Sequence, residues 1–267
     1  MQTIETRLEN GILRITLNRP SSRNALSRQM VAELQEVVAQ ASADDSVKAL
    51  VLRGAGGHFC AGADLADMAA ARMESAGDVD AMAAINRSFG TLISAVHDCP
   101  KTVVAVVEGS VFGGGVGLAC VVDVCLVSGE AKIGLPEVTL GLPPAQIIPF
   151  VVGRVGLSEA RRLALTGARI AGADAFRIGL AHALAEDEAA LDQLLEQTIA
   201  QIQRCAPEAS RMTKSLLLAT TDTPVNDLLD RGAREFAAAA TGEEAMEGTQ
   251  AFLQKRPPNW SSVNRKP

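Results

Sequence analysis

A glycine-rich stretch at 113–117 has the residue types and spacing best suited to chemistry, with glycine at every position except 116. The β-branched run at 103–107 precedes it and an apolar run at 118–122 follows it. We therefore predict a buried strand, a glycine turn and a helix. Glycine permits close backbone approach to a ligand. The helix start presents free N–H groups and the positive end of the helix dipole, so this turn is suited to binding negative charge.

The spacing of these glycines helps to decide whether the bound anion is a phosphate or the oxyanion of a reaction intermediate. A dinucleotide fingerprint requires G-x-G-x-x-G, but Leu118 occupies the position of the last glycine, and no Gly-Lys-Ser/Thr follows as in a phosphate-binding P-loop. The alternative is an oxyanion hole, in which backbone N–H groups stabilise an enolate or a tetrahedral oxygen. That site needs a second donor from another loop.

Glu137 is the carboxylate with the most suggestive surroundings, because it follows Pro136 in a loop flanked by apolar residues. Partial burial would raise its pKa and suit it to acid/base catalysis. The residues alone are explained more simply by a surface carboxylate, so a catalytic role needs further support.

Composition restricts the function classes. The 267 residues are 48% hydrophobic, which is ample for a core, and the net charge of −6 gives no electrostatic support for binding nucleic acid. With no 18-residue apolar run and no basic-then-apolar leader, we predict no membrane span, no signal peptide and a cytoplasmic protein. The five cysteines and three histidines lack metal-ligand spacing, so we expect free thiols and no metal site.

The elements that must position these groups follow from apolar periodicity. We predict strands at 11–17, 47–53, 103–107 and 123–127, with a short one at 132–133. Predicted helices lie at 26–42, 89–96, 158–165, 171–178, 186–204, from Pro207 through Lys214, 225–240 and 243–255. Asn24 or Ser27 would cap the first helix. We interpret 66–85 as a mobile, partly helical segment bordering a pocket, and place a soft boundary near residue 190, where the pattern becomes helical only.

Several motifs together resemble the crotonase (enoyl-CoA hydratase/isomerase) superfamily. They occur in the order and spacing of that family and cover nearly the whole chain: Asn18-Arg19-Pro20 with Asn24-Ala25-Leu26, Phe59-Cys60-Ala61-Gly62-Ala63-Asp64-Leu65, Glu108-Gly109 through Gly113-Gly114-Gly115, Leu135-Pro136-Glu137, and Ala251-Phe252-Leu253-Gln254-Lys255-Arg256. One such motif is weak evidence, but the ordered set is specific.

The resemblance implies an α/β fold, a crotonase-type spiral of ββα units. On this interpretation residues 1–190 form the core with the acyl-CoA site, and 191–267 form a C-terminal helical region that packs in homotrimers, often paired into hexamers. It also implies that the thioester oxygen of an acyl-CoA substrate lies between the N–H groups of Ala63 and Gly114. No further cofactor is expected, since coenzyme A is part of the substrate.

Two carboxylates distinguish the activities within this family. Hydratases that resemble the well-studied enoyl-CoA type use two glutamates to hold water and shuttle its proton, at positions that here are Gly117 and Glu137. This chain therefore retains one of the two. Three interpretations remain open: a hydratase in which Glu137 is the main acid/base, a double-bond isomerase, and a non-catalytic acyl-CoA-binding scaffold.

The segment at 141–152 favours the first interpretation, because it resembles the glutaconyl-CoA hydratases of leucine and acyclic-isoprenoid breakdown. Such substrates carry a second carboxylate and a branch at C3. The carboxylate could help to order water, and the missing side chain at Gly117 could make room for the branch. For that steric reason we favour isohexenylglutaconyl-CoA over methylglutaconyl-CoA. Candidate donors to the second carboxylate are Arg72, Arg87 and Arg154, unranked.

The remaining substrate contacts are also implied by the resemblance. The coenzyme would lie along the loop that includes Ala61, Asp64 and Leu65, beside the turn at Gly113 and near Arg23. Phe252 and Lys255 would close the nucleotide site, often from a neighbouring subunit. Asp64 could instead cap the following helix.

Overall fold

The main sheet has six strands and forms the centre of the fold in the computed structural model, which describes residues 1–261. The strand order is β1-β2-β3-β4-β6-β9. β1 pairs antiparallel with β2, and every other pairing is parallel. In sheet order the strands are Ile4–Glu9, Ile12–Leu17, Ala49–Gly54, Thr102–Val107, Val124–Ser128 and Ala183–Ala185.

A second sheet of three short strands lies beside the first. β5 (Ser110–Phe112) pairs parallel with β7 (Lys132–Gly134), which pairs antiparallel with β8 (Arg169–Ala171). On its other edge β5 is extended by a parallel bridge between Val111 and Cys60. The segment leading to the 61–65 loop therefore runs parallel to β5 and β7.

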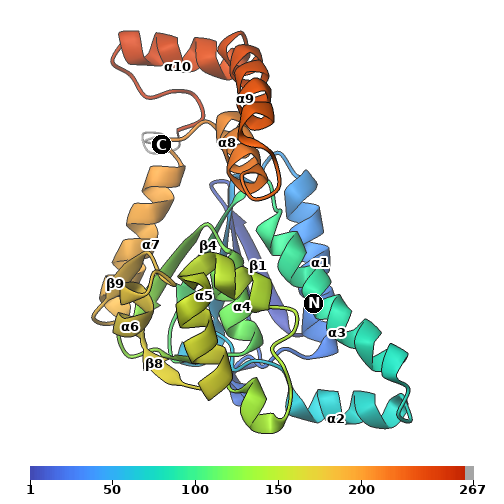
Figure 1. Cartoon of the computed structure of the whole chain (residues 1–267). Helices are drawn as coiled ribbons and strands as arrows, with labels where there is room; N and C mark the ends of the chain where they lie inside the picture. The colour runs from blue at the N-terminus through green and yellow to red at the C-terminus, as the bar shows by residue number, and fades with distance from the viewer. Residues whose placement is uncertain (262–267) are drawn as a thin grey trace.

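Helices cover both faces of the main sheet and continue beyond it (Figure 1). Those up to residue 202 are α1 (Arg28–Ala43), α2 (Leu65–Glu74), α3 (Val79–His97), α4 (Gly114–Val121), α5 (Ile148–Thr166), α6 (Gly172–Arg177) and α7 (Glu188–Ile202). The last three are α8 (Pro207–Ala219), α9 (Val225–Ala240) and α10 (Glu243–Leu253). Short 3-10 helices span Pro20–Ser22, Ala55–Gly57 and Glu137–Leu140.

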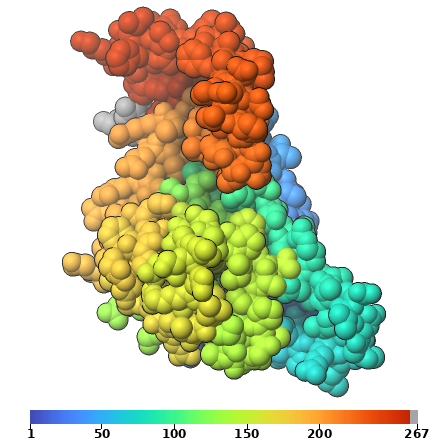
Figure 2. Space-filling model, viewed as in Figure 1, coloured from blue at the N-terminus to red at the C-terminus, as the bar shows by residue number. Residues whose placement is uncertain are grey.

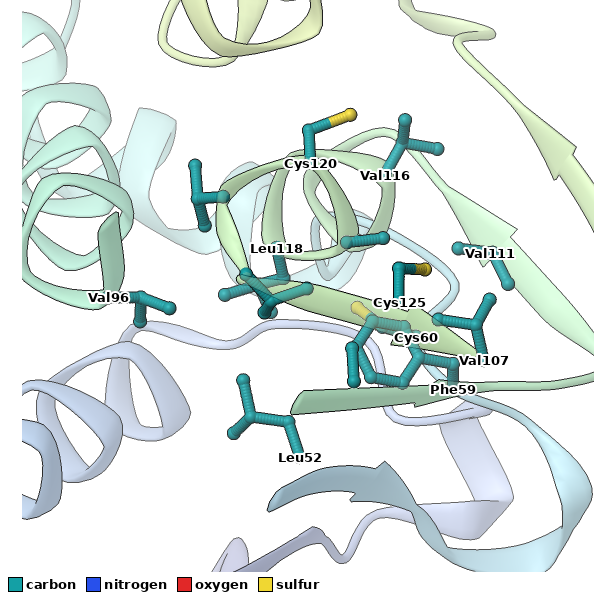
Figure 3. Close-up of a cluster of buried hydrophobic side chains, with 14 of the residues drawn as sticks. Leu52, Phe59, Cys60, Val96, Val107, Val111, Val116, Leu118, Cys120 and Cys125 are labelled. Carbon is teal, nitrogen blue, oxygen red and sulfur yellow. The ribbon is translucent and has the colours of Figure 1, made fainter. Parts of the chain in front are cut away.

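The buried side chains explain why β4 is a continuous apolar run. One cluster packs the sheet against α1, α3, α4 and α5, and a second packs its other face against α7. Since both faces of β4 are covered, its residues 103–107 are all fully buried. Figure 3 shows the first cluster around α4 and the neighbouring strands. α4 is thus held in the core, with its buried side chains packed on all sides.

Most predicted elements are confirmed. The first helix begins after Ser27, whose hydroxyl accepts the Met30 N–H, so Ser27 and not Asn24 is its cap. The 66–85 segment contains α2 and the start of α3, separated by a turn. The predicted helix at 158–165 starts ten residues earlier, at Ile148, with a break at Gly156 where φ is 75°. Strands β1, β5, β8 and β9 were not predicted, and three of them have only three residues.

The C-terminal helices stand apart from the sheets (Figures 1 and 2). The predicted boundary near residue 190 falls inside α7, whose Leu191, Leu195 and Ile199 pack onto the main sheet. α8, α9 and α10 extend away from it, and Lys214 on α8 attaches them to the core through Asp123 at 2.7 Å. No helix within residues 1–261 combines the length and apolar character needed to cross a membrane.

Candidate active site

Three neighbouring parallel segments of the small sheet end at the same place. The segment through Cys60 leads to Ala63, β5 leads to Gly114, and β7 leads to Glu137. Because parallel strands deliver their carboxyl ends to one edge, this pairing brings together three residues that are far apart in the sequence. The structure thus assembles the two predicted amide donors and the predicted acid/base.

The direction of the Ala63 N–H is set by its neighbours. Leu26 donates its N–H to the Gly62 carbonyl at 2.8 Å and accepts the Asp64 N–H at 3.0 Å. In such a parallel bridge the residue between the two partners turns its own N–H to the opposite side. Ala63 is exposed, and its N–H has no hydrogen-bond acceptor within residues 1–261.

The loop that carries Gly114 (the second donor loop) touches the loop that carries Ala63 (the first donor loop) through two glycines. A Cβ built on Gly62 would meet the Phe112 carbonyl oxygen at 2.9 Å and Gly113 Cα at 3.8 Å, so only glycine allows this approach. Both glycines also have positive φ, 94° and 49°. Gly113 donates its N–H to the Gly134 carbonyl, whereas the Gly114 N–H at the start of α4 has no acceptor among the described residues. Two free N–H groups therefore lie on adjoining loops.

Glu137 reaches the same two loops from the third segment. Its Oε1 would lie 2.7 Å from a Cβ built on Gly113. Its Oε2 is buried and has no hydrogen-bond partner in the part of the chain described. Burial raises the pKa of the Glu137 carboxyl above its ordinary value, since desolvation disfavours the carboxylate. A buried carboxyl with a free oxygen beside two free amides is suited to proton transfer at a polarised carbonyl.

Apolar side chains lie next to Gly114, on the side where a Cβ would be. A Cβ built on this residue would lie 2.9 Å from Leu26 Cδ1 and 3.0 Å from Phe89 Cζ. Leu26 thus holds the loop of the first donor through its backbone, and its side chain lies close to Gly114. Such surroundings strengthen the electrostatic effect of the amides on a bound carbonyl oxygen.

The steric prediction for Gly117 is wrong. A Cβ built there would lie 2.3 Å from Ile147 Cγ2 and 3.4 Å from Ile93 Cδ1. Ile147 is buried and occupies the space that a side chain at 117 would need, so no room for a substrate branch is left at this position. Gly117 is required here because the helix packs closely against Ile147, and it lies inside the core rather than on an open pocket wall.

Two residues, Asn24 and His58, hold the segment that leads into the first donor loop; Asn24 was predicted only as a possible helix cap, and His58 was given no role. The Asn24 side chain is buried, donates to the carbonyls of Ala55 and His58, and accepts the Arg19 N–H. His58 accepts the Ser110 N–H on Nδ1 at 3.0 Å. The signal for Asn24 was present in its motif, since a side chain with both donor and acceptor atoms suits the junction of several loops.

The predicted residues of the 61–65 loop have different environments. Asp64 caps α2 by accepting the N–H groups of Ala66 and Asp67, and pairs with Arg19 at 2.7 Å. These contacts lower the pKa of the Asp64 carboxyl against the opposing effect of burial, and they support the capping role. Leu65 is exposed and Ala61 is partly exposed. Arg23 is exposed, and its carbonyl accepts the Ala61 N–H at 2.9 Å.

Phe252 and Lys255 are not brought to this site within one chain. Both are exposed at the end of α10, which lies at the opposite end of the molecule from α2 (Figure 1). A role in substrate binding therefore requires a neighbouring subunit, as the resemblance implies, and stays a prediction.

The three candidate arginines are also separated by the structure. Arg154 donates to the carbonyls of Cys120 and Val122, so its guanidinium is engaged by the protein. Arg72 on α2 and Arg87 on α3 are exposed. Both helices border the donor loops, because Asp64 caps α2 and Phe89 of α3 touches Gly114.

Comparison with known proteins agrees with this geometry. The model of the enoyl-CoA hydratase/isomerase family matches residues 7–264. The chain belongs to that family. The crotonase-type fold is likewise shared with the Pseudomonas aeruginosa protein AtuE, whose structure superimposes with a TM-score of 0.95 at 53% identity and covers 97% of this chain and 100% of that one.

Several relatives with named activities are enoyl-CoA hydratases, and a peroxisomal relative from Arabidopsis thaliana, 28% identical over 273 residues, is named as a dienoyl-CoA isomerase. The enoyl-CoA hydratase ACTT6 of Alternaria alternata is 36% identical over 244 residues, 91% of this chain and 78% of its own length. The 2,3-dehydroadipyl-CoA hydratase of Escherichia coli is 32% identical over 253 residues, 94% of this chain and 96% of its own length. This family member is therefore a hydratase-type enzyme, and enoyl-CoA hydratase/isomerase activity is supported.

Proposed function

We propose that this enzyme adds water across the C2–C3 double bond of a branched, glutaconyl-type enoyl-CoA thioester. The assignment of the reaction type rests on one observation: Glu137 has a buried Oε2 without a partner, beside the free amides of Ala63 and Gly114. In this mechanism the two N–H groups hold the thioester oxygen as it becomes an enolate. The Glu137 carboxylate accepts a proton from water as the water oxygen bonds to C3, and the carboxyl delivers a proton to C2.

The substrate class rests on two further observations. The 141–152 segment resembles that of glutaconyl-CoA hydratases, and the Escherichia coli relative is named for a dicarboxylic enoyl thioester. A distal carboxylate on the substrate would help to order the water that a glutamate at 117 would otherwise hold. The steric reason for preferring isohexenylglutaconyl-CoA over methylglutaconyl-CoA no longer stands, because Ile147 fills the space beside Gly117. The proposal therefore covers both esters.

Of the three candidate arginines, we propose one of the two exposed ones as the donor to the distal carboxylate. Arg154 is engaged by backbone carbonyls, which leaves Arg72 and Arg87. We expect Arg72→Gln or Arg87→Gln to raise KM for glutaconyl esters about tenfold while KM for crotonyl-CoA is unchanged. The variant that raises both KM values equally would not be the carboxylate donor.

The active assembly is proposed to be a homotrimer or a dimer of trimers in the cytoplasm. No residue of α9 is buried, and Val225, Leu229 and Phe236 are exposed along it. Apolar side chains on such a surface fit a subunit interface. Light scattering coupled to size-exclusion chromatography measures the assembly directly, and a monomeric mass would contradict it.

The deciding experiment follows a panel of thioesters by mass spectrometry and by absorbance of the conjugated double bond. The panel contains crotonyl-CoA, a 3-enoyl-CoA, methylglutaconyl-CoA and isohexenylglutaconyl-CoA. We expect gain of water on the glutaconyl esters. A shifted double bond without a mass change would show an isomerase, and binding without any change would show a non-catalytic scaffold.

A further inference from the structure

Arg154 holds the far end of the helix that supplies the Gly114 amide. Its Nε donates to the Cys120 carbonyl at 3.0 Å, and its NH2 group donates to the same carbonyl at 2.9 Å and also to the carbonyl of Val122. These carbonyls belong to the last turn of α4 and the residue that ends it. The last carbonyls of a helix have no intrahelical partners, so Arg154 is its C-terminal cap.

The charge of this guanidinium is not cancelled by a nearby carboxylate. Arg154 forms no ion pair within residues 1–261. The carboxylate next to the end of α4, Asp123, is paired with Lys214 at 2.7 Å and accepts the Val103 N–H. The fourth contact of the guanidinium is with Nε2 of His182, at 2.9 Å. The positive charge is therefore half-buried and directed along the helix.

The helix is short enough for this charge to act at its other end. α4 has eight residues, so it is about 12 Å long. A cation at the C-terminus removes the negative end of the helix dipole and leaves the positive end at Gly114. At an effective dielectric constant of about 20, a unit positive charge at this distance favours the negatively charged form of an oxygen by a factor of roughly ten in equilibrium constant.

We propose that Arg154 is a positioning residue for the oxyanion hole, which acts through α4 by fixing the direction of the Gly114 N–H and raising the positive potential there. The inference rests on the proposed use of Ala63 and Gly114 as oxyanion donors. Arg154 itself is separated from the substrate by the length of the helix.

The test uses a chromophoric thioester, 4-dimethylaminocinnamoyl-CoA, whose absorbance shifts to longer wavelength when its carbonyl is polarised. The wild-type enzyme, Arg154→Gln and Arg154→Lys are compared for this shift and for turnover of the preferred enoyl-CoA. Arg161→Gln is the matched control, because Arg161 is an exposed arginine on the same helix. Circular dichroism and thermal unfolding establish that each variant is folded.

For Arg154→Gln we expect a reduced red shift and about tenfold lower kcat, with an unchanged Kd for coenzyme A. Arg154→Lys keeps the charge and should retain most of the shift, with a kcat loss of about threefold. A folded Gln variant with wild-type shift and turnover would overturn the proposal. If the Gln variant does not fold, a Lys variant with no red shift would overturn it, since its charge is unchanged.

This experiment also separates the inference from the proposed function. A red shift in the wild-type enzyme without hydration of any ester would contradict the hydratase assignment and leave the role of Arg154 standing. A wild-type enzyme that binds the thioester without a red shift would contradict the oxyanion hole and the inference together.

Discussion

One edge of the small sheet carries the Ala63 and Gly114 amides, and we call it the donor edge. The donor edge and the C-terminal helices differ in the kind of group that they leave without a partner. At the sheet edge the backbone is densely hydrogen-bonded, and the free groups are polar: the Ala63 and Gly114 amides and Glu137 Oε2. On α9 and α10 the free groups are apolar, including Phe236, at 75% exposed, and Phe252, at 82%. Polar groups without a protein partner suit a polar substrate, whereas exposed apolar groups suit a protein surface.

We expect the largest effect from removing a polar group at the donor edge, the Glu137 carboxylate. Glu137→Ala removes the carboxylate that reaches the backbone at Gly113, beside the donor amides, so we expect kcat to fall by about 10²–10⁴-fold. Binding of the thioester, measured by calorimetry, should survive, because the amides remain. Glu130→Ala changes an exposed carboxylate in the loop before β7 and is the control. Equal turnover in Glu137→Ala would exclude acid/base catalysis by this residue.

The attachment of the C-terminal helices gives the next largest effect. Lys214→Met leaves Asp123 at the edge of the core without its cation, and removes the Nζ bond to the Lys101 carbonyl. We expect a loss of about 2–3 kcal/mol in the free energy of unfolding, below the range for a fully buried pair because Asp123 is 30% exposed. Urea unfolding measures it. Lys132→Met, at an exposed position, should be neutral, and a neutral Lys214→Met would show that the pair contributes nothing.

The packing around Gly117 can be tested by a double-mutant cycle. Gly117→Ala places a methyl group against Ile147 and should cost about 1–3 kcal/mol of stability. Ile147→Ala alone should cost about 2–4 kcal/mol by leaving a cavity.

The double variant should then be more stable than the sum of the two losses predicts by about 1 kcal/mol or more, since the new methyl group enters the vacated space. Gly153→Ala is the control, because a Cβ at this helical glycine meets nothing within 4 Å. Strict additivity would show that Ile147 does not occupy the space beside Gly117.

The smallest expected effect is in the pH dependence. Burial raises the pKa of Glu137, and hydration starts from its carboxylate form. The rate should therefore fall as the pH drops through this raised pKa, which lies above the value of about 4.3 for an exposed glutamate. The pH profile of kcat measures the position of this limb. The limb should be absent from the residual activity of Glu137→Gln, and a limb that remains there would belong to another group.

The sequence allowed the parts of this molecule that depend on local patterns to be predicted. Val103 to Val107 identified the central strand, and the ordered motifs located Ala63, Gly114 and Glu137. The space beside Gly117 was misjudged because Ile147 lies thirty residues later and its packing is a tertiary contact. The short strands β5 and β8 were missed for a similar reason, since three residues carry too little periodicity and their pairing is set by distant partners.

The bridge between Leu26 and the 62–64 loop has a consequence for how the enzyme folds. Leu26, Cys60, Val111 and Gly134 hold the donor edge together, and each of their backbone contacts joins segments that are distant along the chain. Closing such loops costs chain entropy before any contact is gained, whereas helices such as α7 form from neighbouring residues. On refolding from urea, helical circular dichroism should therefore return before activity, because the oxyanion hole does not exist in a chain that has only its local structure.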